Sequence, residues 1–171
     1  MSKFTELVQI YQTDRQFYHN YEQAGFQFAQ LLTEAVKNYY QIPEENFFFI
    51  GGEDQQKTVS SLTEALLMDE KGFWHVRYGL NIPYTDTPPQ GQGFLLIVEI
   101  LFKKLNGRFI VRLPEEEDFF IHSEESETDF SSFLHYLHDY LCRFLENRFE
   151  RFLNGEQTER SAIGFRIHEK E

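Results

Sequence analysis

"GFLLIVEILFKKLNGRFIVRLP", residues 93–114, is the stretch that decides the fold. Asn106–Gly107 is the preferred pair for a short type I′ turn, so the stretch predicts an antiparallel hairpin. Such a turn fixes the register and places Leu105 opposite Arg108, Phe102 opposite Val111 and Leu101 opposite Arg112. One face of the hairpin then lacks polar residues and is predicted to be the core face. It carries Phe94, Leu96, Val98, Ile100, Phe102, Phe109, Val111 and Leu113.

The opposite face of this hairpin carries Glu99, a lone carboxylate in an apolar strand. Burying a carboxylate without a partner is costly, so Glu99 needs a partner or a shifted pKa. Arg112 lies diagonally from it across the hairpin and is close enough to meet it. One hypothesis is a ligand pocket between sheet and helices, built by Glu99, Arg112, Arg77, His75 and Tyr78. The other is a cross-strand ion pair. The sequence does not decide which sheet face His75 and Arg77 occupy.

The N-terminal quarter predicts two helices. Ser2 can cap the first helix, and Thr13 with Gln16 forms a capping box for a second helix beginning near Asp14. Pro43 disfavours a helical residue before it and ends the second helix at residues 41–42. We expect the Phe and Tyr side chains of both helices to lie mostly in the core, with a dimer or partner face as the alternative.

Further strands are expected at both sides of the hairpin. "NFFFIGG", residues 46–52, predicts a buried strand, and "DFFIH", residues 118–122, predicts another. Residues 59–68 are ambiguous, because Ser61 and Glu64 can cap a short helix whereas the following "DEKG" suits a hairpin. We favour the hairpin slightly. Residues 155–171 are a terminal strand or a tail. Together the pattern predicts a single α+β domain over residues 1–171, with an antiparallel sheet of about four to six strands.

A long C-terminal amphipathic helix is expected over about residues 129–153, packed on one sheet face. Its apolar side is formed by residues such as Phe133, Leu137 and Leu141. The opposite side carries His135, His138, Asp139 and Cys142, whose side chains are all able to bind zinc. Three interpretations are open: a polar surface, a face packed on another subunit or on the N-terminal helices, and a metal site. We favour the polar surface.

An acidic segment, residues 115–129, holds eight carboxylates and no Lys or Arg. It is either a solvated loop or a docking surface for a basic protein. The residues predicted for such a surface are Glu115, Glu116, Glu117, Asp118, Glu124, Glu125 and Glu127.

Charge and composition restrict the function further. A net charge of −12 disfavours nucleic-acid binding, which needs clustered Lys and Arg. The longest apolar run is too short for a membrane span, and one cysteine favours a reducing, cytoplasmic location. We find no motif of a nucleotide site, a catalytic serine or a cofactor, and expect no cofactor.

The leading functional prediction is therefore a non-enzymatic, cytoplasmic interaction protein, such as a chaperone, adaptor, inhibitor or immunity-like protein, that binds a basic partner. The alternative is a small-ligand binder or enzyme that uses the Glu99 pocket. DNA mimicry by the acidic surface is a third possibility, and a homodimer remains open.

Overall fold

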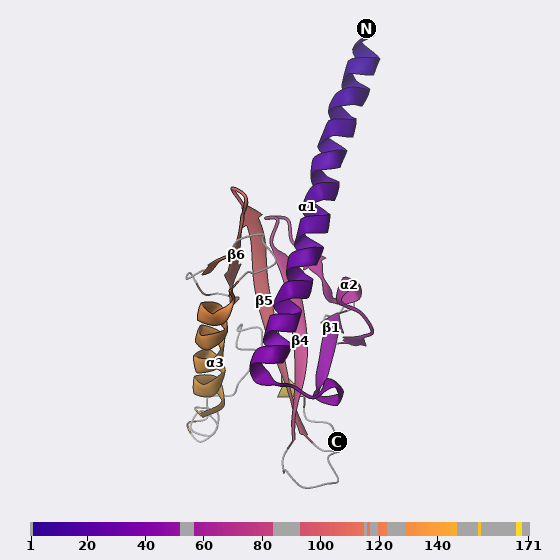
Figure 1. Cartoon of the computed structure of the whole chain (residues 1–171). Coiled ribbons are helices and arrows are strands. Elements are labelled where there is room, and N and C mark those ends of the chain that lie inside the picture. The colour runs from indigo at the N-terminus through magenta and orange to yellow at the C-terminus, as the bar shows by residue number, and fades with distance from the viewer. Residues whose placement is uncertain are drawn as a thin grey trace.

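The computed structural model describes residues 2–51, 57–83, 93–114, 116, 120–122, 129–146, 154 and 167–168. It is an α+β fold in which a long N-terminal helix and a C-terminal helix accompany an antiparallel sheet (Figure 1). The helices are α1 (Lys3–Tyr40), the 3₁₀ helix η1 (Glu44–Asn46), α2 (Leu62–Ala65) and α3 (Ser131–Glu146). The strands are β1 (Phe47–Gly51), β2 (Lys57–Val59), β3 (Leu67–Met68), β4 (Trp74–Pro83), β5 (Gly93–Leu105), β6 (Arg108–Arg112), β7 (Phe120–His122) and β8 (Ile167–His168).

The sheet has the strand order β2-β1-β4-β5-β6-β7, with β3 paired to β4 and β8 paired to β5. Every pairing is antiparallel, which confirms the predicted sheet and the strands at residues 47–51 and 120–122. β4 and β5 form the longest ladder, from Trp74 opposite Phe102 to Pro83 opposite Gly93. These two strands lie at the centre of the sheet.

The β5–β6 hairpin has the register that its turn predicts. Leu101 pairs with Arg112, Phe102 with Val111 and Leu105 with Arg108. Asn106 and Gly107 have φ values of 51° and 74°, which are the two positive values that a type I′ turn requires.

The core lies on the predicted apolar face, and both long helices cover that face. Phe28 of α1 stacks on Phe109 at 4.0 Å between ring centroids and contacts the rings of Phe102 and Phe130. From α3, the buried side chains are Phe133, Leu134, Leu137, Leu141 and Phe144. Trp74, Val76 and Tyr78 of β4 belong to the same cluster.

The prediction of two N-terminal helices is wrong, because α1 is continuous from Lys3 to Tyr40. Thr13 does not cap a new helix: its Oγ1 donates to the carbonyl oxygen of Gln9, four residues earlier. Gln16 Nε2 donates to Asn20 Oδ1 instead of reaching back. A threonine hydroxyl can bond the preceding turn without interrupting a helix, and no Gly or Pro breaks the chain there. Ser2 does cap α1, accepting from the backbone N–H of Thr5.

In residues 59–68 the structure contains both of the alternatives that the sequence left open. The slightly favoured hairpin is wrong for residues 62–65, which form α2 with Ser61 Oγ accepting from the N–H of Glu64. It is right for β3, which pairs with β4 through Leu67 opposite His75. Ser61 and Glu64 cap the helix at residues 62–65, whereas "DEKG" forms the turn between β3 and β4. The two signals belong to successive segments, so both structures form.

The predicted C-terminal helix is confirmed over residues 131–146, where Asp129 Oδ1 accepts from the N–H of Ser131. Residues 147–153 lie outside the described residues. Of the terminal segment 155–171, the structure describes β8, which pairs with Leu95 and Leu96 of β5.

Candidate functional site

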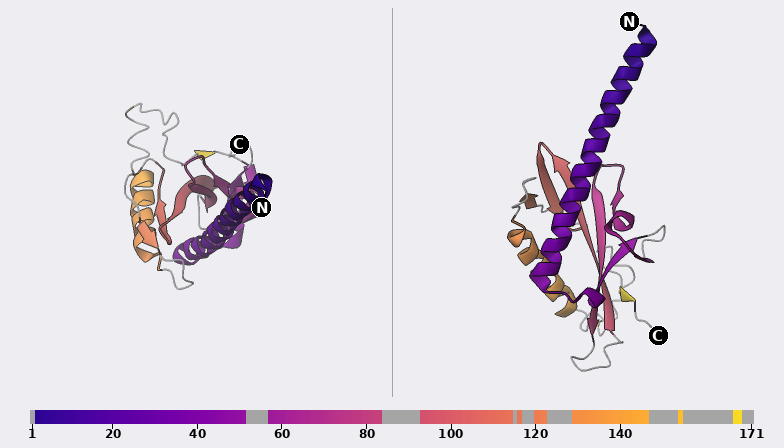
Figure 2. Two further views of the ribbon diagram at one scale, coloured as in Figure 1. Left: turned by 90° about the horizontal axis from the view of Figure 1, so that it is seen from above. Right: turned by 45° about the vertical axis from the view of Figure 1, so that its right-hand side comes forward.

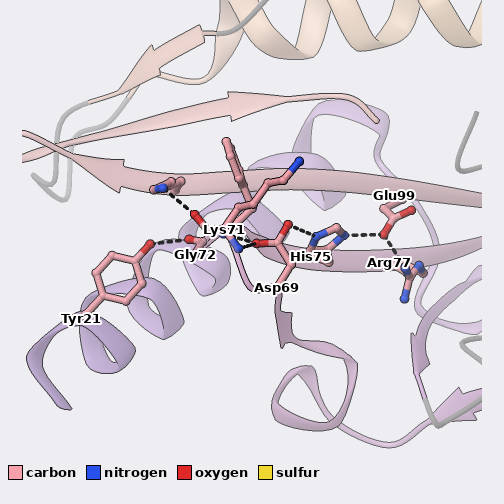
Figure 3. Close-up of polar contacts among 9 residues, drawn as sticks. Tyr21, Asp69, Lys71, Gly72, His75, Arg77 and Glu99 are labelled. Atoms are coloured by element: carbon pink, nitrogen blue, oxygen red, sulfur yellow. Dashed lines mark hydrogen bonds and ion pairs between the residues drawn. The ribbon is translucent and has the colours of Figure 1, made fainter. Parts of the chain in front are cut away.

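A chain of four charged side chains crosses the sheet face that points away from the helices (Figure 3). It begins at Asp69, which follows β3, continues through His75 of β4 to Glu99 of β5, and ends at Arg77 of β4, which contacts the same Glu99 oxygen. Side chains alternate between the two faces of a strand, so the odd-numbered His75 and Arg77 face away from the core that Val76 and Tyr78 enter. Arg77 lies directly opposite Glu99 in the ladder, so His75 and Arg77 both lie on the Glu99 face of the sheet.

The geometry of this network is tight. Arg77 Nη2 donates to Glu99 Oε1 at 2.5 Å, and His75 Nδ1 lies 2.9 Å from the same oxygen. His75 Nε2 lies 3.2 Å from Asp69 Oδ2. Both ring nitrogens therefore face carboxylates, which suits the imidazolium form because only that form donates from both nitrogens. The four charges sum to zero.

The pKa shifts follow from these contacts. Burial raises the pKa of Glu99, but the His75 hydrogen bond and the charge of Arg77 outweigh burial and hold it below its usual range. The Glu99 hydrogen bond raises the pKa of His75 against the opposing effect of burial, and Asp69 adds to the rise. For Asp69, burial is again outweighed, here by the N–H of Phe73 and by His75, so its pKa is lowered. Each group thus stabilises the charged form of its neighbour.

Asp69 also organises the turn that joins β3 to β4. Its Oδ1 accepts from the N–H groups of Lys71 and Phe73, and Gly72 adopts the positive φ of 77° that closes the turn. Tyr21 of α1 donates its hydroxyl to the carbonyl oxygen of Gly72 at 2.7 Å (Figure 3). The turn between β3 and β4 is therefore bonded both to Asp69 of the charged network and to Tyr21 of α1.

Two of the five residues predicted for a pocket lie elsewhere. Tyr78 is on the core face, where its buried hydroxyl lies 2.9 Å from Thr33 Oγ1 of α1. Arg112 does not reach Glu99, because its guanidinium lies over the Phe73 ring at 4.6 Å from the centroid. A directly opposite residue is closer than a diagonal one, and Arg77 holds that opposite position. The predicted location between sheet and helices is also wrong, since the helices cover the other face.

The network has the features of a structural clamp. Glu99 Oε1 is already held by two donors, and the side chains of Glu99 and Arg77 are only 12% and 11% exposed. A general base or a ligand anchor must be accessible to its substrate, whereas this carboxylate is largely buried. The contacts of Oε1 join β5 to β4, and the contact of His75 with Asp69 adds the turn that follows β3.

The second feature is the N-terminal half of α1, residues 3–20, which we call the arm. Figures 1 and 2 show that it extends past the end of the sheet, whereas the second half of α1 lies against the core. Between residues 2 and 20, every residue except Val8 is exposed. Six large apolar side chains of the arm are at least 60% exposed: Phe4, Leu7, Ile10, Tyr11, Phe17 and Tyr18.

The prediction that the N-terminal aromatic side chains lie mostly in the core is therefore wrong for the arm. It holds from Gly25 onward, where Phe28, Leu32 and Val36 are buried. The root of the arm is Tyr21, which is half-buried and stacks on Trp74 at 6.2 Å between ring centroids. Of the eleven large hydrophobic side chains that are exposed among the described residues, six lie on the arm.

The four histidine, aspartate and cysteine residues of α3 lie at its edge toward α1. His135 and His138 contact the Tyr39 ring edge-on, at 5.5 and 6.2 Å between centroids. Cys142 Sγ lies 3.5 Å from His138 Nε2, and His135 Nδ1 contacts the carbonyl oxygen of Ser131. Asp139 is exposed. Within the described residues, no three His, Cys, Asp or Glu side chains come together in a way that could hold a metal ion.

Of the seven acidic residues predicted for a partner surface, only Glu116 is among the described residues, just after β6. Glu115, Glu117, Asp118, Glu124, Glu125 and Glu127 lie outside them.

Comparison with known proteins provides no relative. The chain matches no protein-family model, and no curated protein or solved structure is significantly similar to it. Among the described helices, none combines the length and the apolar character that crossing a membrane requires.

Proposed function

We propose that this protein is a non-enzymatic interaction protein of the cytoplasm that binds a basic partner protein. The observation that carries the proposal is the exposed apolar stripe on the arm. Soluble proteins rarely expose contiguous apolar patches of more than a few hundred Å² unless the patch binds something. The six exposed apolar side chains of the arm, each at least 60% exposed, carry on the order of 800 Å² of accessible surface, since a large aromatic residue contributes about 150–250 Å².

The arm also lacks the support that a stable helix of this kind needs. Helices in proteins derive most of their stability from packing an amphipathic face, and short unsupported helices are marginal in water. Packing against a protein would supply the missing contacts. The polar groups of the arm suit such a partner better than an anionic membrane, because the two cationic side chains of residues 3–20 are balanced by two carboxylates.

The net charge of −12 supports a basic partner. Complementary charge speeds the encounter of two proteins and suppresses binding to partners of the wrong sign. The acidic segment 115–129 is the densest source of that charge along the chain and is our candidate for the surface that attracts the partner.

The alternative of a ligand pocket around Glu99 and Arg112 gains no support from the geometry. Glu99 is occupied by His75 and Arg77, and Arg112 is stacked on Phe73. A clamp of this kind stabilises the sheet and requires no ligand. We therefore propose no second function.

The test is mass spectrometry of proteins that co-purify with the tagged full-length chain from its own cells at low salt. We expect one stoichiometric basic protein, released when salt screens the charges. Glu116→Gln with Glu117→Gln should weaken the capture. A matched control is Glu44→Gln with Glu45→Gln, which removes the same charge at the exposed η1 helix. Recovery of the chain alone, or equal capture by both variants, would contradict the proposed partner surface.

A further inference from the structure

We infer that the arm pairs with the arm of a second copy of this chain, and that the two arms run antiparallel. This inference rests on the proposed role of the arm as a protein-docking surface and assigns the arm to a second copy, whereas the basic partner is assigned to the acidic segment 115–129.

The apolar stripe of α1 follows an uninterrupted spacing of three and four residues. From the arm it includes Phe4, Leu7, Tyr11, Asp14 and Tyr18; it passes through the half-buried Tyr21 at the root of the arm and continues into the core with Gly25, Phe28 and Leu32. This alternation is the a/d pattern of a coiled coil, in which the seam of one helix packs against the seam of another. The opposite face of the arm is polar throughout: Thr5, Glu6, Gln9, Gln12, Thr13, Gln16, His19 and Asn20. The side of the helix that meets the core at Phe28 is thus the side left uncovered in the arm.

Asp14 selects the orientation. It is the only charged residue of the seam between Phe4 and Tyr21. In a parallel pair, equivalent residues face each other, so two Asp14 carboxylates would meet in an apolar interface and repel. In an antiparallel pair an a position faces a d position. The register that keeps all six seam positions paired sets Phe4 against Tyr21, Leu7 against Tyr18 and Tyr11 against Asp14 of the second copy. The Tyr11 hydroxyl can then donate to the Asp14 carboxylate.

The residues beside the seam favour the same orientation. Ile10 and Phe17, which are 61% and 68% exposed, lie on one flank, while Arg15 and Glu22 lie on the other. In a parallel pair the two unlike flanks face each other, which would place Phe17 beside Glu22 of the second copy. In an antiparallel pair like flanks meet, so Ile10 and Phe17 pack against Phe17 and Ile10 of the second copy.

The charge of the molecule also fits antiparallel pairing. The arm is neutral, because Lys3 and Arg15 balance Glu6 and Asp14, so the whole net charge of −12 belongs to the rest of the chain. Antiparallel arms hold the two Gly25 positions roughly 37 Å apart at a rise of about 1.5 Å per residue. That separation exceeds the Debye length of about 8 Å at physiological salt several-fold. Parallel arms would place the two acidic bodies side by side.

The size of the interface is sufficient. The six exposed apolar side chains of one arm carry on the order of 800 Å² of accessible surface, since a buried aromatic residue contributes about 150–250 Å². A stable protein interface buries about 800 Å² per partner. A second copy can therefore cover the stripe with no contribution from the sheet.

Disulfide cross-linking of the purified full-length protein tests the pairing and its direction. Leu7→Cys and Tyr18→Cys are prepared separately on a Cys142→Ser background, with different tags, then mixed and oxidised. Both sites are exposed in the single chain, so folding should be unaffected. We expect the mixed 7–18 disulfide, because facing seam positions come within the distance that a disulfide spans. Gln16→Cys on the polar face is the control and should cross-link at least about tenfold less, because its thiols point away from the pair.

Disulfides joining 7 to 7 and 18 to 18 would overturn the antiparallel direction. Yields no higher than those of the Gln16→Cys control would overturn the pairing itself. The experiment contains no other protein, so its failure would leave the proposed basic partner standing. Conversely, a 7–18 disulfide combined with no co-purifying protein would support the inference and contradict the proposed partner.

Discussion

Arg77 lies directly opposite Glu99 across β4 and β5, and its Nη2 donates to Glu99 Oε1 at 2.5 Å. His75 joins the same oxygen and continues the network to Asp69, so four alternating charges connect β5 to the turn after β3. That turn accepts the hydroxyl of Tyr21 at the root of the arm. The network on the Glu99 face of the sheet therefore connects, through this turn, to Tyr21, where the arm begins.

Glu99→Gln should destabilise the protein by about 2–3 kcal/mol, because it leaves Arg77 partly buried without a counter-charge. Urea denaturation measures the change in the free energy of unfolding. Arg77→Met with Glu99→Gln removes both charges and should cost less than the sum of the two single changes. A Glu99→Gln protein as stable as the wild type would contradict the clamp.

The network should make stability depend on pH in a defined direction. The raised pKa of His75, ordinarily 6.5, means that its stabilisation is complete below about pH 6.5 and is lost as the pH rises through the folded value. The lowered pKa of Glu99, ordinarily 4.5, means that its stabilisation is complete above about pH 4.5 and is lost as the pH falls through the folded value. Both contributions are present together between these limits.

Comparing wild type with His75→Gln from pH 5 to 9 measures this effect. The stability advantage of the wild type should shrink above pH 6.5, by roughly 1.4 kcal/mol for each unit by which the pKa is raised. Asn81→Gln, on the same strand but outside the network, should show no such change in slope. An advantage that stays constant over this range would mean that His75 does not titrate with the network.

Gly25→Ala should weaken the attachment of α1 to the sheet. A Cβ at this position would overlap the indole of Trp74, so the ring must move. Alanine gains about 1 kcal/mol over glycine in a helix, but overpacking costs about 1–3 kcal/mol, so we expect a net loss of up to about 2 kcal/mol. Trp74 is the only tryptophan, and its fluorescence should shift as the Tyr21 stack changes. Gln27→Ala, at an exposed position, is the control; an unchanged spectrum and stability in Gly25→Ala would contradict the close packing.

Asp14→Leu should strengthen self-association of the arm by about tenfold or more, because an apolar residue replaces a charge in the seam. It should also remove the preference for antiparallel pairing, so that 7–7 and 18–18 disulfides appear beside the 7–18 product. Thr13→Leu adds an apolar residue to the polar face and should change neither property. Weaker association of Asp14→Leu would show that Asp14 is not in the seam.

The hairpin and its faces could be predicted from the sequence because Asn106–Gly107 permits one register and the alternation of side chains then follows. The partner of Glu99 could not, because the register of β4 against β5 is set through the long connection at residues 84–92, which has no comparable turn signal. Without that register, the diagonal Arg112 was the only cation that could be placed on the Glu99 face, because the face of His75 and Arg77 was undetermined. The directly opposite Arg77 became evident only from the ladder.

The exposure of the arm was missed for a different reason. The apolar spacing of residues 4–21 is the same whether the stripe faces the core of its own chain or another chain. Length was the available signal: a helix of 38 residues extends about 57 Å, whereas the 13 residues of β5 extend about 44 Å. The sheet that this sequence can build is therefore too short to cover α1 completely. On α3, by contrast, helical periodicity alone separated the buried side of Leu137 from the side of His138.

Sedimentation equilibrium of the purified full-length protein is the most direct test of the arm as an interface. We expect the mass of the wild type to rise with concentration from 20.5 kDa toward twice that value. Added salt should not dissociate the pair, because the contact is apolar and both bodies are acidic. Leu7→Glu with Tyr18→Glu should remain at 20.5 kDa with unchanged thermal stability. A wild-type protein that stays at 20.5 kDa at every concentration and salt would contradict the pairing.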